Sequence, residues 1–151
     1  MIETSEKEVR QHLTKWQDIL RLRDWDIIVR IVKTKWRKSG DIKIDLDDKK
    51  AVLMINHNPK CEKREEMEEL VVHELLHVKL FGMDQMMEDL LSIVYGKNDN
   101  PKREFAYTQF MTLLESTTED LTKGCLEAAK IQNALSFGRL SKSIEEELGD
   151  N

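Results

Sequence analysis

Apolar residues recur with two different periods along this chain, and the change of period separates helical from extended segments. In residues 5–23 they fall every three to four positions, which predicts an amphipathic helix. The residues that form this stripe are Val9, Leu13, Trp16 and Leu20. In residues 25–31 they fall at every second position, which predicts a half-buried strand. The chain is therefore expected to begin with a helix that is followed by a strand.

Two further strands are predicted before the pattern changes again. Ile42, Ile44 and Leu46 alternate with more polar residues, and residues 51–55 form a short apolar run. The charged residues 47–50 between them are typical of a hairpin connection. We therefore expect a small sheet of three strands.

The most apolar stretch of the chain, residues 59–82, returns to the period of a helix. Asn58 suits its N-cap and Pro59 its first turn, and Gly82 is a natural end. The second half is apolar on nearly every side, which is typical of a buried helix. Its apolar residues are Leu70, Val71, Val72, Leu75, Leu76, Val78, Leu80 and Phe81.

Helical patterns continue through the rest of the chain. Residues 85–95 predict a short helix, residues 96–101 a polar loop, and residues 103–135 a long helix. The order of helix, three strands and further helices predicts an α+β fold. A length of 151 residues suits a single domain over residues 1–151, with residues 136–151 as a partly loose, charged tail.

Composition and charge exclude some classes of binding partner. The formal net charge of -5 disfavours a general nucleic-acid binder, and no apolar run reaches the length of a membrane span. The first fifteen residues have no signal-peptide core, and Cys61 and Cys125 match no metal or redox spacing. We therefore expect a cytoplasmic protein with free thiols that binds neither nucleic acid nor membrane. The oligomeric state is left open.

Two other groups of residues receive structural interpretations. The basic run over residues 33–38 is interrupted by Trp36 and precedes a glycine-containing turn, so we interpret it as a solvated strand end. Bulky aromatic and sulfur-containing side chains are expected to fill the core rather than to bind a cofactor. These are Trp16, Trp25, Met83, Met86, Met87 and Met111.

The apolar helix contains the run His73-Glu74-Leu75-Leu76-His77. A spacing of four residues places both imidazoles on one helical face, where they can bind one Zn²⁺. Glu74 then lies close enough to act as general base on a water molecule. Because polar side chains in such an apolar helix are costly unless they bind something, a metal site is favoured over satisfied core histidines.

A third ligand can be sought by elimination. No histidine follows His77, which excludes every pattern completed by a downstream histidine and leaves a carboxylate. Glu115 and Glu119 lie one helical turn apart in the long predicted helix. We favour Glu115 as the ligand, and Glu119 is either an alternative ligand or the acceptor of a hydrogen bond from a ligand histidine. The other acidic candidates are Glu88, Asp89, Glu104 and Asp120.

These motifs resemble those of the small phage and bacterial zincin-like metallopeptidases of the minimal gluzincin type. The resemblance covers about residues 16–129, and only the histidine-containing motif is specific. It rests on residues 25–29, 51–56, 69–77 and 115–121. In the gluzincin pattern an acid follows the ligand Glu by four residues, and Glu119 stands where Asp is more usual. The resemblance implies a short twisted sheet over the helix of the motif, with a cleft between the sheet edge and the metal.

The same resemblance implies an intracellular zinc peptidase. A peptide or protein substrate would add as a strand to an edge strand at residues 51–56. Glu74 would take a proton from the attacking water and deliver it to the leaving amine. Tyr107, Tyr95 and His57 are candidates to stabilise the oxyanion, although a structural role is favoured for each of them. Two alternatives stay open: a zinc hydrolase that acts on another amide or ester, and a non-catalytic interaction or regulatory module on the same scaffold.

Overall fold

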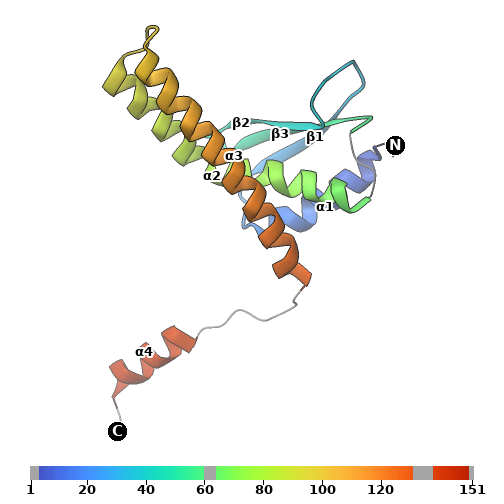
Figure 1. Cartoon of the computed structure of the whole chain (residues 1–151). Helices are drawn as coiled ribbons and strands as arrows, with labels where there is room; N and C mark the ends of the chain where they lie inside the picture. Colours follow the sequence, from blue (N-terminus) through green and yellow to red (C-terminus); the bar gives the residue numbers. More distant parts are fainter. Residues whose placement is uncertain (1–3, 60–63, 131–137, 150–151) are drawn as a thin grey trace.

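The computed structural model of the chain describes residues 4–59, 64–130 and 138–149 (Figure 1). It is an α+β structure with a three-stranded sheet, as the sequence predicts; the sheet is mixed, and the described part holds four helices. The elements are α1 (Glu6–Ile19), β1 (Asp26–Val32), β2 (Gly40–Asp45), β3 (Lys50–Asn56), α2 (Arg64–Tyr95), α3 (Pro101–Lys130) and α4 (Gly138–Leu148).

The strand order of the sheet is β1-β3-β2, so β3 is the central strand. It is parallel to β1 and antiparallel to β2, with Ile55 opposite Ile31 and Gly40. The prediction that residues 51–56 form an edge strand is therefore wrong. Their unbroken apolar run is typical of a strand that is enclosed by neighbours, and the strand at the free edge beside the helices is β2.

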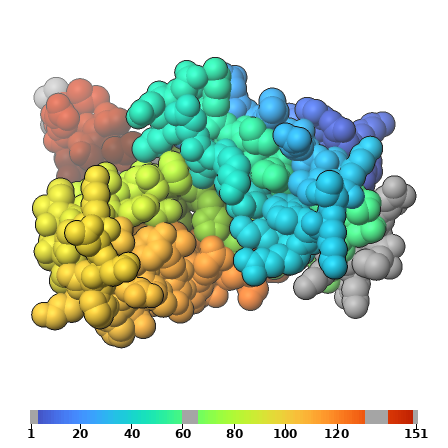
Figure 2. All heavy atoms as spheres, turned by 90° about the horizontal axis from the view of Figure 1, so that it is seen from above, coloured from blue at the N-terminus to red at the C-terminus, as the bar shows by residue number. Residues whose placement is uncertain are grey.

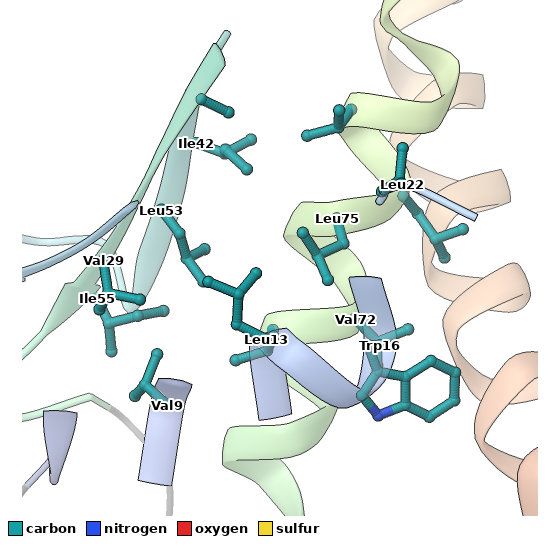
Figure 3. Packing of buried hydrophobic residues seen from close by; sticks show 14 of the residues in the cluster. Val9, Leu13, Trp16, Leu22, Val29, Ile42, Leu53, Ile55, Val72 and Leu75 are labelled. Carbon is teal, nitrogen blue, oxygen red and sulfur yellow. The ribbon is translucent and has the colours of Figure 1, made fainter. Parts of the chain in front are cut away.

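The core lies between one face of the sheet and helices α1 and α2 (Figure 3). Val9 and Trp16 of α1, Leu53 and Ile55 of β3 and Leu75 of α2 are all fully buried. Burial of these side chains removes apolar surface from water on three elements at once, which holds α2 in place behind the sheet.

Only some of the expected core residues lie in the core. Trp16 and Trp25 are buried, as predicted, but Met83 and Met86 are 64% and 71% exposed. These two methionines lie on the part of α2 that extends beyond the sheet, so the core does not cover them. The prediction that they fill the core is wrong.

Helix α2 continues through Gly82 and is one helix to Tyr95, so a separate helix over residues 85–95 is not formed. Gly82 keeps helical geometry because α3 packs along α2 and stabilises both halves. The glycine that ends α2 is Gly96, whose φ of 80° is the left-handed conformation that glycine adopts at little cost. Asn100 then caps α3, since its Oδ1 accepts a hydrogen bond from the backbone N–H of Lys102 at 2.9 Å.

The expected outer boundaries of these helices fall partly outside the described residues. Pro59, expected in the first turn of α2, is not helical, and the next four residues, 60–63, are not described. Residues 131–135, the expected end of α3, also lie outside the described residues. Within the described part, α2 and α3 form an antiparallel hairpin that projects past the sheet (Figure 1). Residues 138–148 of the expected loose tail form α4, which contacts no other described element. Among the described helices, none combines the length and the apolar character that crossing a membrane requires.

Candidate metal centre

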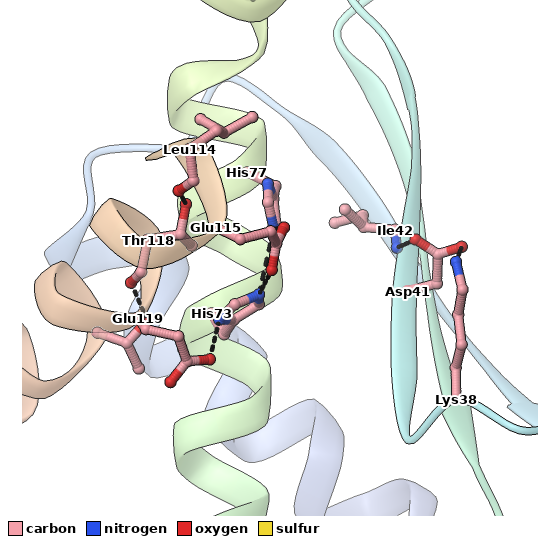
Figure 4. Close-up of polar contacts among 10 residues, drawn as sticks. Lys38, Asp41, Ile42, His73, His77, Leu114, Glu115, Thr118 and Glu119 are labelled. Carbon is pink, nitrogen blue, oxygen red and sulfur yellow. Dashed lines mark hydrogen bonds and ion pairs between the residues drawn. The ribbon is translucent and has the colours of Figure 1, made fainter. Parts of the chain in front are cut away.

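Three side chains from two helices converge between α2 and α3 (Figure 4). His73 and His77 project from successive turns of α2, and Glu115 projects from the facing turn of α3. Nε2 of His77 lies 3.1 Å from Nε2 of His73 and 2.9 Å from Oε1 of Glu115. Oε2 of Glu115 lies 3.5 Å from Nε2 of His73. We refer to these three residues as the His-His-Glu cluster.

The separations within the His-His-Glu cluster fit a zinc ion. Tetrahedral zinc, with bonds of about 2.0–2.1 Å to nitrogen and oxygen, holds neighbouring ligand atoms about 3.3 Å apart. Nε2 of His77 lies 3.1 Å from Nε2 of His73 and 2.9 Å from Oε1 of Glu115, slightly below that value, and the other oxygen of Glu115 lies 3.5 Å from Nε2 of His73. Two imidazole nitrogens and a carboxylate oxygen are also a donor set that zinc accepts. The cluster therefore matches zinc in both donor type and spacing.

Burial of His77 favours the form that binds a metal. The side chains of His73 and His77 are only 12% and 20% exposed, respectively. Burial lowers the pKa of His77, although the nearby carboxylate of Glu115 opposes this effect. A neutral imidazole keeps a lone pair for coordination, so the surroundings of His77 favour its ligand state.

Glu119 lies on the other side of the His73 ring. Its Oε1 is 2.8 Å from Nδ1 of His73, and the two atoms are close without the alignment of a hydrogen bond. The structure thus brings Glu115, and not Glu119, to the two Nε2 atoms. The remaining acidic candidates do not line the cleft around the cluster; they are Glu88, Asp89, Glu104 and Asp120.

Two buried threonines explain how α3 holds both glutamates against α2. Thr118 and Thr122 are fully buried. Each hydroxyl donates a 2.7 Å hydrogen bond to a carbonyl one turn earlier in α3, that of Leu114 and that of Thr118, respectively. Because these side chains are small and their polar atoms are satisfied, they fit in the buried interior. Glu115 and Glu119, one turn apart on the neighbouring face of α3, can then both reach His73.

The His-His-Glu cluster opens into a cleft of about 860 Å³. Edge strand β2 and the segment before it form one wall, and the α2–α3 hairpin forms the other (Figures 2 and 4). Gly40 lets β2 approach α2 closely, because a Cβ at that position would lie 3.1 Å from Cδ1 of Leu70. Other residues that line these two walls are Lys38, Asp41, Ile42, Ile44, Phe81, Asp84 and Met111.

Glu74 lines the same cleft and is only 7% exposed. Burial, together with the nearby carboxylates of Asp41 and Glu115, raises the pKa of Glu74 to about 8. A divalent cation beside Glu74 would favour its ionised form instead. Its position in the cleft that both histidines line, and its buried surroundings, are suited to proton transfer inside the cleft.

Asp41 is a cleft residue that the sequence analysis did not identify. Its Oδ1 accepts a 2.9 Å hydrogen bond from the backbone N–H of Ile42, and its Oδ2 lies 3.0 Å from Nζ of both Lys38 and Lys43. No motif marks Asp41 or Lys38, because their place beside the cluster depends on which strand forms the sheet edge. The basic run over residues 33–38 therefore ends at the cleft, and not merely in solvent.

The three candidate oxyanion donors are not among the residues that line the cleft, which favours the structural role expected for each of them. His57 follows the central strand, and its Nδ1 lies 3.2 Å from the carbonyl oxygen of Val32 on the side of β1. Tyr95 ends α2 at the tip of the hairpin. Tyr107 lies near Asp84 and Glu88, and burial together with these two carboxylates raises its pKa.

Comparison of the chain with protein families, with curated proteins and with solved structures finds no match. The resemblance to zincin-like metallopeptidases thus stays a hypothesis from the sequence motifs. The case for a metal centre rests on the geometry of His73, His77 and Glu115.

Proposed function

We propose that this chain is a zinc-dependent hydrolase of zincin-like architecture that acts on peptides. The observation that carries the proposal is the convergence of the Nε2 atoms of His73 and His77, 3.1 Å apart, with the carboxylate of Glu115, whose two oxygens lie 2.9 Å from His77 and 3.5 Å from His73. Glu74 stands beside them in the same cleft. A metal-binding scaffold without turnover has no chemical need for that carboxylate, so Glu74 favours catalysis over a purely structural metal site.

The residues divide the chemistry among them. His73, His77 and Glu115 would hold the zinc, which supplies Lewis-acid activation of water and of the substrate carbonyl when bound. Glu74 accepts a proton from the attacking water and delivers it to the leaving amine. Glu119 orients the ring of His73 from its Nδ1 side.

A peptide is the favoured substrate class because the cleft is bordered by a free strand edge. The edge is β2, whose residues Gly40, Ile42 and Ile44 line the cleft opposite the His-His-Glu cluster. An extended peptide can add to such an edge through main-chain hydrogen bonds, which would hold its backbone along the cleft. In this proposal β2 takes the role that the sequence analysis gave to residues 51–56.

The test is Glu74→Gln in the zinc-loaded chain, incubated with a mixture of unstructured peptides that is followed by mass spectrometry. Peptide cleavage should fall by about 10²–10⁴-fold while the zinc content stays that of the wild type. Glu69→Gln is a matched control, because Glu69 lines the same cleft on α2 but lies outside the segment from His73 to His77. Cleavage at the wild-type rate by Glu74→Gln would overturn the proposed base. Hydrolysis of small amides or esters without any peptide cleavage would overturn the peptide as substrate class and would favour a hydrolase of non-peptide substrates.

A further inference from the structure

The cleft contains an acidic side chain that the proposed metal centre does not use. Asp84 lies on α2 seven residues beyond His77, so the two side chains share one face of the helix about 10 Å apart along its axis. Asp84 lines the cleft and is half-buried. It belongs neither to the His-His-Glu cluster nor to the proposed proton transfer. Its carboxylate is therefore available to a substrate in the cleft.

No cation compensates Asp84 within the described part of the chain. Asp84 has neither a hydrogen bond nor an ion pair with any residue that the structure describes. Burial and the nearby carboxylate of Glu88 raise the pKa of Asp84, whereas His77 lowers it. Glu88 itself accepts a 3.4 Å hydrogen bond from Nε2 of Gln85. A cation that enters the cleft beside Asp84 would stabilise its ionised form.

Apolar side chains flank Asp84 in the cleft. Phe81 precedes it by three residues on the same side of α2, between His77 and Asp84. Met111 of α3 and Ile44 of β2 line the same cleft. Apolar walls that end at a carboxylate suit a side chain with an apolar stem and a cationic end, which is the construction of lysine and arginine.

The register of the α2–α3 hairpin places Met111 level with Asp84. Arg103 of α3 donates a 3.2 Å hydrogen bond to Oγ of Ser92 on α2. Asp84 precedes Ser92 by eight residues, and Met111 follows Arg103 by the same number. Because the two helices are antiparallel, Asp84 and Met111 lie at about the same height along the hairpin. Both side chains therefore belong to one end of the cleft, beyond the His-His-Glu cluster.

The cleft as a whole is acidic. Six carboxylates line it besides Asp84, and Lys38 is the only lysine or arginine that does so among the described residues. Nζ of Lys38 lies 3.0 Å from Oδ2 of Asp41, so its charge is already paired. A single divalent ion would leave the excess of negative charge in place. Because a cleft lined by one sign of charge concentrates ligands of the opposite sign, a cationic peptide is favoured.

We propose that Asp84 selects the substrate of this cleft, and that this substrate is a peptide with a lysine or arginine within about three residues of the scissile bond. An extended peptide covers the distance of about 10 Å from the level of His77 to that of Asp84 in about three residues. The stem of the basic side chain packs on Phe81 and Met111, and its cationic end pairs with Asp84. This inference rests on the proposed function, because it takes the cleft as the site where the peptide is cleaved.

The test is the binding of labelled peptides to full-length Glu74→Gln supplied with zinc, measured by fluorescence anisotropy. Short peptides of alanine, serine and valine carry one lysine at each position in turn, and in a second set that lysine is acetylated, which removes its charge. The best lysine peptide should bind at least about tenfold more tightly than its acetylated counterpart. Adding Asp84→Asn should abolish this preference. Adding Asp89→Asn is the matched control and should keep it, because Asp89 is exposed on α2 outside the cleft.

Equal binding of the lysine and acetyl-lysine peptides would overturn the proposal, as would a preference that survives Asp84→Asn or the absence of any peptide binding. Cleavage of the same peptides by the wild type, followed by mass spectrometry, tests the proposed function separately. Cleavage without a preference for lysine would overturn selection by Asp84 and leave the hydrolase in place. Binding with a preference that depends on Asp84, but without cleavage, would overturn the hydrolase and would support Asp84 as a site for basic peptides.

Discussion

Oε1 of Glu119 lies 2.8 Å from Nδ1 of His73, while Nε2 of the same ring faces Glu115 and His77. A carboxylate at Nδ1 favours the tautomer in which that nitrogen carries the proton, and the lone pair is then on Nε2. One face of α3 thus contacts both sides of the His73 ring. In the proposed metal centre, two glutamates one helical turn apart therefore have different roles.

Loss of Glu119 should weaken zinc binding without removing a ligand. We expect Glu119→Ala to lower the zinc affinity about 10–100-fold, because the tautomer and orientation of His73 are no longer held. Glu115→Ala should lower it further, since it removes the coordinating oxygen. Competition with a chromophoric chelator measures both effects. Asp120→Ala is the control, because Asp120 is exposed on α3 outside the cleft. Equal zinc affinities for Glu119→Ala and the wild type would contradict the role of Glu119 in holding His73.

The local parts of the site were predictable from the sequence because helical geometry fixes them. A spacing of four places His73 and His77 on one face, and the same spacing separates Glu115 from Glu119. Which glutamate lies beside the Nε2 atoms depends on the axial position of α3 relative to α2. That position is set by packing at Thr118 and Thr122, which belong to no recognisable sequence motif.

The strand order and the helix boundaries were harder to predict for a related reason. The apolar run of β3 indicates a strand, but its central place depends on pairing with β1, which lies 24 residues earlier in register. Gly82 would end an isolated helix, yet contacts with α3 outweigh its low helix propensity, which costs about 1 kcal/mol. Asp41 reaches the cleft only because β2 becomes the edge strand. Long-range pairing, and not local pattern, decides each of these features.

Enlarging a buried threonine of α3 should disturb the metal centre indirectly. Thr118→Leu adds volume to a fully buried position between Glu115 and Glu119, so it should displace α3 and cost about 1–3 kcal/mol of stability. Zinc affinity should fall as well, although no ligand is altered. Thr112→Leu is the matched control, because Thr112 is exposed on the same helix and makes the same type of hydrogen bond, at 2.9 Å to the carbonyl of Thr108. Urea denaturation and chelator competition measure the two effects, and wild-type values of both for Thr118→Leu would contradict this account.

The contact between α1 and α2 should depend on pH through Glu68. Its Oε1 accepts 2.7 Å hydrogen bonds from Nε1 of Trp16 and Nζ of Lys15. Partial burial alone would raise the pKa of Glu68, but these two hydrogen bonds outweigh it and lower the pKa below the ordinary value of 4.5. The stabilisation is therefore complete above about pH 4.5 and is lost as the pH falls through the lower pKa of the folded state.

Glu68→Gln should accordingly be less stable than the wild type by about 1 kcal/mol at pH 7, a modest value because Lys15 is exposed. The difference should shrink as the pH falls below about 4.5, since the wild-type carboxylate then also becomes neutral. Thermal unfolding of both proteins between neutral and acidic pH measures it. A gap of the same size at both ends of that range would show that charge on Glu68 is not the cause.

The most direct test of the central claim is the zinc content of the full chain, purified without chelator, dialysed against metal-free buffer and analysed by atomic emission. The His-His-Glu cluster predicts one zinc ion per chain in the wild type and a loss of that zinc when His73 and His77 are both replaced by Ala. A wild type that retains substantially less than one zinc per chain, or a double variant that retains as much zinc as the wild type, would contradict the metal centre.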